Sequence, residues 1–489
     1  MDRDNFRFDS GILALPEKST AAGKIIEMAV YLLLILLFLS MAVSMCGYAP
    51  LSVTLAAAAL VLILCFTGRR EWDARAALPA ILLLAAAVRI AYIFIVPTQP
   101  VSDFSLLYEK AKDAAAGDFG FAYASEGYFS WWQYQIPFVL YEAAVYRVTS
   151  SMAALKLLNV VWSVGIDYLI YRMASRFLTK RSSLLAAFMY AVYPAQIIYA
   201  SVLTNQHISM FFMLLGIELL LGARTWRDCA LSGAMLGFGN LMRPEAAIVV
   251  AAIVCCALCR FIERPAKKAL FRTILMLAAV LLAYFLVQKA AELILGLLGM
   301  APYGLGNSAP EWKLVVGLNT ETGGLLSDRD VAVLDISDSA LRRERSLAIV
   351  KNYLDSCGDL FAFFAGKFEY FWARMEDYTF TLGGVSVWDE AVPGISFEAL
   401  VSALSTVELT MRLAAYFLAA GGCAYFSVAA LKKRGGTGNL TPLLTAAVLC
   451  GVVLAYLVIE IQPRYRYIAM PFVFITAAAA HGRILRKTQ

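Results

Sequence analysis

A short polar segment near the C-terminal end of the sequence could bind a phosphate group. Residues 460–467 have the sequence Glu-Ile-Gln-Pro-Arg-Tyr-Arg-Tyr and lie between two apolar blocks. The guanidinium groups of Arg464 and Arg466 have planar donors that match phosphate oxygens bidentately. The alternative is that both arginines contact only the phosphates of membrane lipids. The other candidate ligands of a bound phosphate are Tyr465, Arg243 and His207.

Asp103 is the candidate general base. It follows the apolar block 81–96 within seven residues. A carboxylate placed next to a hydroxyl group can take the proton of that hydroxyl. The apolar residues after it have the spacing of one helix face: Phe104, Leu107, Tyr108 and Ala111. The alternatives are that Asp103 caps this helix, where the helix dipole stabilises its charge, or that it is a solvated loop residue.

Residues 317–324 could form a second ligand-binding element. Their sequence, Gly-Leu-Asn-Thr-Glu-Thr-Gly-Gly, is polar and rich in glycine. Asn319 or Glu321 could bond to a polar ligand such as a sugar, and the alternative is an ordinary surface turn. The remaining candidate contacts to a sugar or its acceptor are Glu460, Trp131 and Asn205.

The sequence predicts no metal site and no disulfide framework. His207 and His481 are the two histidines; they are too far apart to suggest zinc, and His207 could instead cap a helix. Most of the nine cysteines lie in apolar blocks, where thiols pack as small buried side chains. The sequence has no Walker motif and no dinucleotide fingerprint. We therefore expect no cofactor; a divalent metal is compatible with the sequence but is not expected.

The composition is that of a membrane protein. Of the 489 residues, 61% are hydrophobic and only 16% are charged, and the mean hydropathy is +0.69. Soluble domains have about 25% charged residues, so an ordinary soluble enzyme is excluded. The apolar residues form long blocks such as 28–43 and 81–96, and a bilayer span needs about 20 residues. The net charge of +6 lies largely in short loops, so it reports membrane topology and not nucleic-acid binding.

The apolar blocks predict an all-α polytopic membrane protein with about twelve transmembrane helices. We also expect an interfacial helix over 136–148, next to an aromatic belt that includes Trp131. The block 228–241 is short and precedes Arg243-Pro244, which predicts either a tight hairpin with the arginine near the outer surface or a helix that is broken there. The predicted spans are 25–46, 50–67, 76–96, 155–177, 183–200, 206–223, 228–241, 244–260, 270–290, 400–430, 441–459 and 464–482.

The distribution of basic residues predicts the orientation. Lys and Arg occur in alternate loops, as at 180–181 and 224–227, and such loops face the cytoplasm. Both termini are then cytoplasmic, and we expect no cleaved signal peptide. The predicted organisation is a cytoplasmic segment 1–24, two additional transmembrane helices in 25–75, a core 76–290 with an outer loop 97–154, a large extracytoplasmic segment 291–398, and C-terminal helices with a short cytoplasmic tail in 399–489.

Several motifs, taken in order, resemble the GT-C superfamily of integral-membrane glycosyltransferases. The similarity is to the branch of protein mannosyltransferases and the lipid A aminoarabinose transferase, and it covers roughly 76–482. The motifs are VSDFSLLYEKAKDAAAGDFG (101–120), WWQYQIP (131–137), AVYPAQIIYASVLTNQ (191–206), LMRPEA (241–246) and EIQPRYRYIAMP (460–471). One departure is that residues 204–207 are Thr-Asn-Gln-His where the family often has a second acidic residue. A metal that bridges two carboxylates is therefore less expected.

The resemblance implies a glycosyltransferase that uses a polyprenyl-phosphate sugar donor. The acceptor would be an extracytoplasmic glycan, lipid or protein, and the active site would face away from the cytoplasm. Asp103 would take the proton of the acceptor hydroxyl, while Arg464, Arg466 and Arg243 would stabilise the departing lipid phosphate. The sugar would then be transferred by direct displacement with inversion.

Two other functions are compatible with the sequence. A polymerase or ligase of lipid-linked glycans would also need outward-facing arginines, but its donor would carry a diphosphate. A transporter or lipid flippase belongs to a different class. Transporters place ionisable groups near the midplane of the membrane and contain internal repeats, and neither feature is evident in this sequence.

Overall fold

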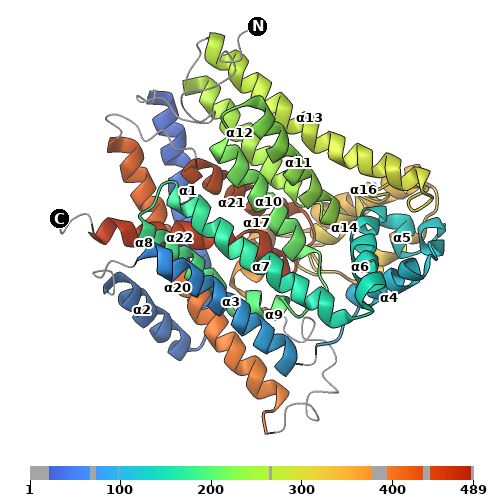
Figure 1. Ribbon diagram of the computed structural model, residues 1–489, viewed down its shortest axis with the longest axis horizontal. Helices are drawn as coiled ribbons and strands as arrows, with labels where there is room; N and C mark the ends of the chain where they lie inside the picture. Colours follow the sequence, from blue (N-terminus) through green and yellow to red (C-terminus); the bar gives the residue numbers. More distant parts are fainter. Residues whose placement is uncertain are drawn as a thin grey trace.

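The computed structural model describes residues 21–66, 73–96, 98–263, 267–376, 394–432 and 441–485 (Figure 1). Within these ranges the regular elements are α-helices and short 3-10 helices, and no strand occurs in them. The predicted all-α fold is therefore confirmed for this part of the chain. Residues 1–20 of the predicted cytoplasmic segment 1–24 lie outside the described residues. Several of the basic loop residues also lie outside them.

Six helices contain stretches that are long and apolar enough to cross a membrane: α1 (Ala21–Tyr48), α3 (Ala74–Ile95), α7 (Met152–Ser175), α13 (Lys267–Leu297), α20 (Phe397–Lys432) and α21 (Thr441–Val458). Four more are apolar but shorter: α2 (Leu51–Phe66), α10 (Gln206–Gly222), α12 (Ala246–Glu263) and α22 (Met470–Leu485). These helices identify a multi-pass membrane protein. The count of twelve spans stays a prediction.

Two predicted spans differ from the observed helices, and each difference lies next to a proline. The span 183–200 is divided into α8 (Lys180–Ala191) and α9 (Pro194–Tyr199), because the residue before a proline disfavours helical geometry. The last span begins later than predicted: Pro463–Ile468 forms the 3-10 helix η7, and α22 starts at Met470. The predicted hairpin is confirmed, since α11 (Trp226–Met242) ends one residue before Arg243 and α12 follows at Ala246.

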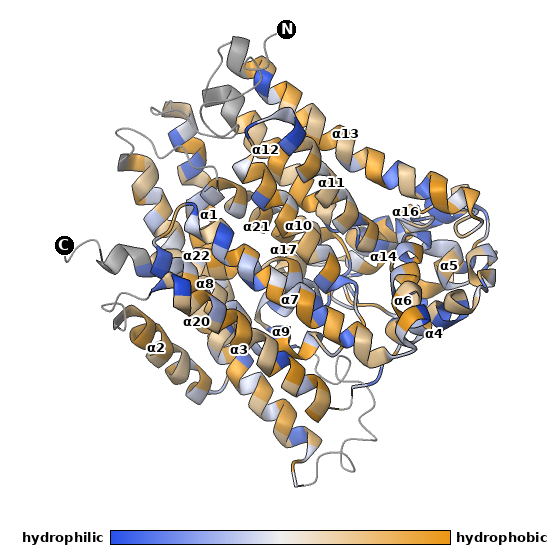
Figure 2. Ribbon diagram, in the orientation of Figure 1, coloured by the Kyte–Doolittle hydropathy of each residue, from blue (hydrophilic) through white to orange (hydrophobic). Residues whose placement is uncertain are grey.

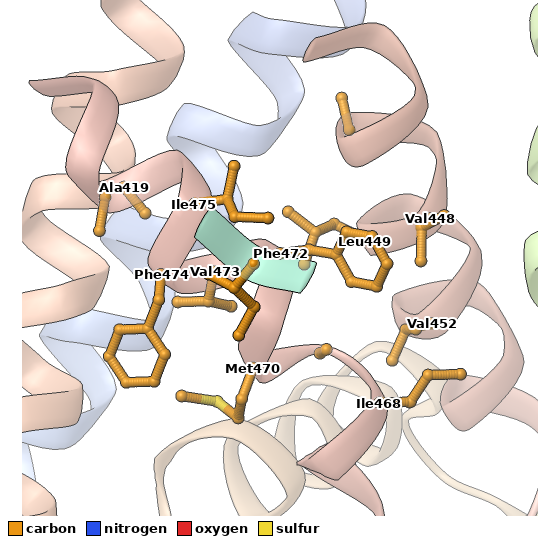
Figure 3. Close-up of a cluster of buried hydrophobic side chains, with 14 of the residues drawn as sticks. Ala419, Val448, Leu449, Val452, Ile468, Met470, Phe472, Val473, Phe474 and Ile475 are labelled. Carbon is orange, nitrogen blue, oxygen red and sulfur yellow. The ribbon is translucent and has the colours of Figure 1, made fainter. Parts of the chain in front are cut away.

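The apolar core of the bundle surrounds α22. Figure 3 shows Phe472, Phe474 and Ile475 of this helix close to Ala419 of α20 and Leu449 of α21. All of these side chains are buried. A helix that is apolar on every side is stable only when other elements enclose it, so α22 is a central helix of the bundle.

Small residues allow several helices to approach closely. In α11, Gly233 and Gly237 are four residues apart and both contact α13. A Cβ atom added at Gly233 would lie 2.1 Å from the carbonyl oxygen of Val280. This is the small-xxx-small arrangement by which membrane helices pack backbone against backbone.

Two polar segments gather at one end of the bundle, which we call the polar end (Figure 1). Hydrophilic residues are concentrated there around α14 and α16 (Figure 2). The first segment contains α4 (Asp103–Ala116), η3 (Gly120–Tyr123), α5 (Tyr128–Trp131), η4 (Gln133–Gln135) and α6 (Ile136–Thr149). The second contains α14 (Trp312–Gly317), α15 (Asp328–Val331), η5 (Ala332–Asp335) and α16 (Ser339–Ser356); it is followed by α17 (Leu360–Ala373), which lies in the middle of the bundle and contacts α1 and α21 (Figure 1). The helices predicted after Asp103 and over 136–148 are therefore present as α4 and α6.

Candidate active site

A cavity of about 720 Å³ lies at the polar end. Its lining comes from parts of the chain that are far apart in sequence: the start of α4, the turns around η4, the α9–α10 junction, the α11–α12 turn, the end of α13, residues 305–313 and η7. The predicted site residues that it brings together are Asp103, Asn205, Arg243, Glu460, Arg464 and Tyr465.

Asp103 is the first residue of α4 and lines the cavity. The N-cap of this helix is the preceding residue, Ser102, so Asp103 does not itself cap the helix; it lies in the first turn, where the helix dipole stabilises its charge as predicted. Ser102 has φ 52° and ψ −131°, and its side chain makes no capping hydrogen bond. A positive φ at a residue other than glycine costs about 1–3 kcal/mol and is concentrated at functional sites. The backbone is therefore strained directly before the candidate base.

The electrostatic surroundings of Asp103 are mixed. Burial within the cavity walls raises the pKa of the Asp103 carboxyl, although the side chain remains accessible from inside the cavity. The positive charges of Arg464 and Lys313 lower the pKa, and the charge of Glu460 raises it. A carboxylate whose pKa lies above the usual range for aspartate is a better proton acceptor near neutral pH.

Two guanidinium groups approach the ring of Tyr465. Arg243 lies over this ring at 5.2 Å from its centroid, and Arg464 lies over it at 5.4 Å. Arg464 also lies 5.1 Å from the ring centroid of Phe104, the residue after Asp103. Cations near aromatic faces are stabilised by the ring quadrupole. Tyr465 and Phe104 therefore help to hold both arginines at the cavity.

The α11–α12 turn fixes the position of Arg243. Its Nε donates to Glu245 Oε1 at 2.6 Å, and its Nη1 donates to Asn205 Oδ1 at 3.2 Å. Asn205 in turn donates to the backbone oxygen of Met242 at 2.9 Å. Asn205 therefore orients an arginine, and this contact occupies its side-chain oxygen.

Lys313 is a cation of the cavity that the sequence analysis did not predict. Its Nζ donates to Glu460 Oε2, and Gln462 donates to Glu460 Oε1 at 2.7 Å. Burial opposes the charge of both partners. The attraction between Lys313 and Glu460 nevertheless holds the pKa of Glu460 below its usual range. Tyr465 and Glu460 together raise the pKa of Lys313. Both groups are therefore charged at neutral pH.

Arg466 and His207 do not line the cavity. Arg466 is buried: its Nη2 donates to Glu376 Oε1, and its Nη1 donates to the backbone oxygens of Phe371 and Arg374, each at 2.7 Å. Its guanidinium is thus held by protein groups, which argues against the predicted phosphate contact. His207 is also buried, with Nδ1 at 2.6 Å from the hydroxyl of Tyr467.

The turn at 317–324 also lies outside the cavity. Asn319 is buried, donates to both carboxylate oxygens of Asp330 and accepts a hydrogen bond from the backbone of Glu321. The side chain of Glu321 is 61% exposed and pairs with Arg329. These contacts are those of the surface-turn alternative. Trp131 is likewise not part of the lining, although its ring packs against that of Trp132 at 5.5 Å.

Sequence reasoning missed several other lining residues, which share aromatic or amide side chains: Tyr128, Trp132, Tyr134, Gln135, Gln206 and Trp312. Four of them lie within the motifs at 131–137 and 191–206: Trp132, Tyr134, Gln135 and Gln206. The motifs therefore indicated the right segments, although these residues were not predicted as site residues. Among the described residues, no group of three or more His, Cys, Asp or Glu side chains is arranged to hold a metal ion.

A family model provides the comparison that bears most directly on function. Residues 139–290 match the model of the dolichyl-phosphate-mannose-protein mannosyltransferases. The match indicates a glycosyltransferase. It includes Asn205 and Arg243 of the cavity, and it confirms the predicted resemblance to membrane glycosyltransferases. No curated protein sequence matches the chain.

Solved structures with a similar arrangement include an oligosaccharyltransferase from Archaeoglobus fulgidus. Its apo crystal structure has 13% sequence identity and a TM-score of 0.42, and the alignment covers 82% of this chain and 50% of that chain. The same protein in complex with an inhibitory peptide and a dolichol-phosphate has 13% identity and a TM-score of 0.42, with 84% and 50% covered. This chain thus spans about half the length of that protein.

Proposed function

We propose that this protein transfers a monosaccharide from a polyprenyl-phosphate donor to an acceptor outside the cytoplasm. The observation that carries the proposal is one cavity in which a carboxylate, Asp103, lies in the electrostatic field of Arg464 and Lys313, with Arg243 also in the lining. These cations come from three separate elements. The family match to enzymes named for dolichyl-phosphate-mannose supports a lipid monophosphate as the donor.

The proposed reaction is a direct displacement at the anomeric carbon. Asp103 takes the proton of the acceptor hydroxyl, and the hydroxyl oxygen forms a bond to the anomeric carbon. The bond from that carbon to the phosphate oxygen breaks, and the lipid phosphate leaves with its electron pair. Arg464, Arg243 and Lys313 stabilise the negative charge of the departing phosphate. The configuration of the sugar is inverted because attack and departure occur on opposite faces.

Two predicted sugar contacts take a different role in this proposal. Glu460 is bonded to Lys313, and Asn205 is bonded to Arg243. We therefore assign both residues to the positioning of cations. Arg466 and His207 are left out of the donor site because their side chains are held inside the bundle.

The lipid tail of the donor would leave the cavity along α13. Phe285 and Gln288 of this helix line the cavity, and Phe285 is 57% exposed on a helix that is long enough to cross the membrane. An exposed apolar side chain at that place would face lipid. The charge distribution of the loops supports an orientation in which the polar end lies outside the cytoplasm.

The test is donor turnover in proteoliposomes. Purified protein would be given polyprenyl-phosphate monosaccharides or, in a second arm, diphosphate-linked oligosaccharides, and the release of free polyprenyl phosphate or diphosphate would be measured. We expect release from a monophosphate donor and a loss of roughly 100-fold or more in Arg464→Gln. The matched control is Arg345→Gln, which removes an exposed arginine from α16. Release only from diphosphate donors would identify a ligase or polymerase and contradict the proposal.

A further inference from the structure

An aromatic cluster forms one wall of the cavity. It consists of Tyr128, Trp132 and Trp312, all of which line the cavity. The ring centroids of Trp132 and Trp312 are 5.3 Å apart with an interplanar angle of 52°, and those of Tyr128 and Trp132 are 4.7 Å apart at 74°. Trp132 belongs to the first polar segment and Trp312 to the second, so the cluster exists only when the two segments are together.

Backbone and side-chain hydrogen bonds hold the two segments in register. The backbone nitrogen of Tyr134 donates to the oxygen of Gly306 at 3.2 Å. The backbone nitrogen of Ser308 donates to the oxygen of Trp131, and its hydroxyl donates to Gln133 Oε1, both at 2.9 Å. The aromatic cluster is therefore preorganised, and a ligand would not have to order it.

One polar atom of the cluster has no partner. The indole nitrogen of Trp312 donates to the backbone oxygen of Asp330 at 2.9 Å. The indole nitrogen of Trp132 is buried, and no described residue accepts its hydrogen. An unpaired buried donor costs about 1–3 kcal/mol. An oxygen atom of a bound ligand would satisfy this donor.

The cluster and the proposed base, Asp103, line the same cavity. The hydroxyl of Tyr128 interacts electrostatically with Asp103 and accepts a hydrogen bond from Gln135 Nε2 at 3.1 Å. On the other side of the cluster, the ammonium of Lys313 lies 4.8 Å from the ring centroid of Trp312. A ligand on the aromatic cluster would therefore lie in the same cavity as the base and the phosphate-binding cations.

We propose that the aromatic cluster binds a pyranose ring of the acceptor, so that the acceptor of this enzyme is a saccharide. This inference rests on the proposed function, because it uses Asp103 as the base. The apolar C–H face of a pyranose packs on aromatic rings, while its hydroxyls need separate polar partners. The indole nitrogen of Trp132 and the amides of Gln135 and Asn307, which also line the cavity, supply such partners.

A peptide acceptor fits these features less well. Extended peptides commonly bind by pairing with an exposed strand edge, and the described residues contain no strand. The wall carries aromatic rings and amides, and its nearest charges already belong to the proposed donor and base sites. We therefore argue for a saccharide and treat a peptide as an outcome of the test.

The first experiment measures saccharide binding to the full chain in lipid nanodiscs. The probes are methyl pyranosides and their 1,4-linked disaccharides, followed by saturation-transfer NMR. We expect binding to wild type and an apparent affinity about fivefold to tenfold weaker in Trp132→Leu. Trp132→Phe keeps a ring but removes the nitrogen donor, so its affinity should be intermediate. The matched control is Trp226→Leu, because Trp226 is 43% exposed and lies at the opposite end of α11 from the cavity residue Arg243, about 25 Å along the helix axis.

The second experiment adds the polyprenyl-phosphate monosaccharide donor to the same proteins. A glycosylated saccharide product, with KM for the saccharide raised in Trp132→Leu and kcat less affected, would support the inference. A saccharide that only competes with the donor would overturn it, because the ring would then occupy the donor sugar site. Transfer to a Ser/Thr peptide at the same rate in Trp132→Leu and wild type would also overturn it. Unfolding temperatures of all variants would show that each one is folded.

Failure of the proposed function and failure of this inference would give different results. Saccharide binding that depends on Trp132, without release of polyprenyl phosphate from any donor, would support the saccharide site and contradict the donor chemistry. Release of polyprenyl phosphate with no saccharide bound at any probe concentration would support the donor chemistry and overturn this inference.

Discussion

Neighbouring residues of η7 have different surroundings. Arg464 and Tyr465 line the cavity, whereas Arg466 and Tyr467 are buried in the bundle. Arg466 is bonded to Glu376 and to two backbone oxygens, and a buried arginine cannot leave such partners without a large cost. Only Arg464 of the pair therefore lines the cavity, and Arg466 fixes the element that carries it.

The sequence could predict which types of residue occur in the site, but only partly which individual residues line the cavity. Arg464 and Arg466 are chemically identical and two residues apart, so their spacing could not show which one lines a cavity. Lys313 could not be predicted because its partner, Glu460, is 147 residues away in the sequence. Asp103 was recognisable because it is an acid within seven residues of an apolar block and at the start of a helical pattern.

The charges around Asp103 predict a pH effect. Burial raises the pKa of Asp103, and the charges of Arg464 and Lys313 oppose that rise. A general base is active when ionised, so transfer is lost as pH falls through its pKa. Lys313→Met removes one opposing charge, so the pKa of Asp103 should rise further. We expect the acid limb of kcat/KM against pH to move to higher pH.

The double variant Lys313→Met/Glu460→Gln is the matched control for this profile. It removes a positive and a negative charge that act on Asp103 in opposite directions. Its acid limb should lie closer to that of wild type, and it leaves no buried carboxylate without a partner. An acid limb that stays in place or moves to lower pH in the single variant would contradict the electrostatic coupling.

At the scale of elements, helices were predictable where the chain is apolar, and most of their ends lie within four residues of the predicted positions. The end of α13 is an exception, because this helix continues to Leu297 and the predicted span ended at residue 290. The single span predicted at 183–200 is two helices because Tyr193 takes an extended conformation before Pro194. Residues 463–468 form a 3-10 helix outside α22, and this break turns Arg464 and Tyr465 toward the cavity. Pro194 and Pro463 are both evident in the sequence, but the predicted span boundaries follow hydropathy alone.

The close contact of α11 with α13 predicts that even one added methyl group between these helices will destabilise the protein. A Cβ atom at Gly233 would lie 2.1 Å from a backbone oxygen of α13, so Gly233→Ala must push the two helices apart. We expect a loss of roughly 1–3 kcal/mol of stability, seen as a lower unfolding temperature in nanodiscs. Transfer activity should fall as well, because Gln288 at the far end of α13 lines the cavity.

Gly366→Ala in α17 is the control for this substitution. No heavy atom lies within 4 Å of a Cβ built at Gly366, so the added methyl group should be tolerated. An unfolding temperature for Gly233→Ala that equals that of wild type would contradict the packing argument.

At the scale of the whole molecule, apolar blocks separated by charged loops predicted the helical bundle and its two polar segments. They could not predict the cavity, because its lining is assembled from segments spread between residues 102 and 465. The contact between the two polar segments depends on backbone hydrogen bonds such as that from Ser308 to Trp131. Hydropathy carries no information about such contacts.

The predicted orientation can be tested with a native cysteine. Cys357 is partly exposed in the turn after α16, within the polar segment that we expect outside the cytoplasm. A membrane-impermeant maleimide should therefore label the protein in intact cells, and Cys357→Ser should remove that label. Labelling of Cys357 only after the membrane is permeabilised would contradict the orientation.

The most direct measurement of the central claim compares the kcat of wild type with that of Asp103→Asn in the proteoliposome transfer reaction. Asparagine has nearly the same shape as aspartate but cannot accept the proton, so kcat should fall by roughly 10²–10⁴ with little change in KM for the donor. Asp355→Asn, which changes an exposed aspartate at the end of α16, should retain full activity. Full transfer activity in folded Asp103→Asn would contradict the assignment of Asp103 as the base and with it the proposed mechanism.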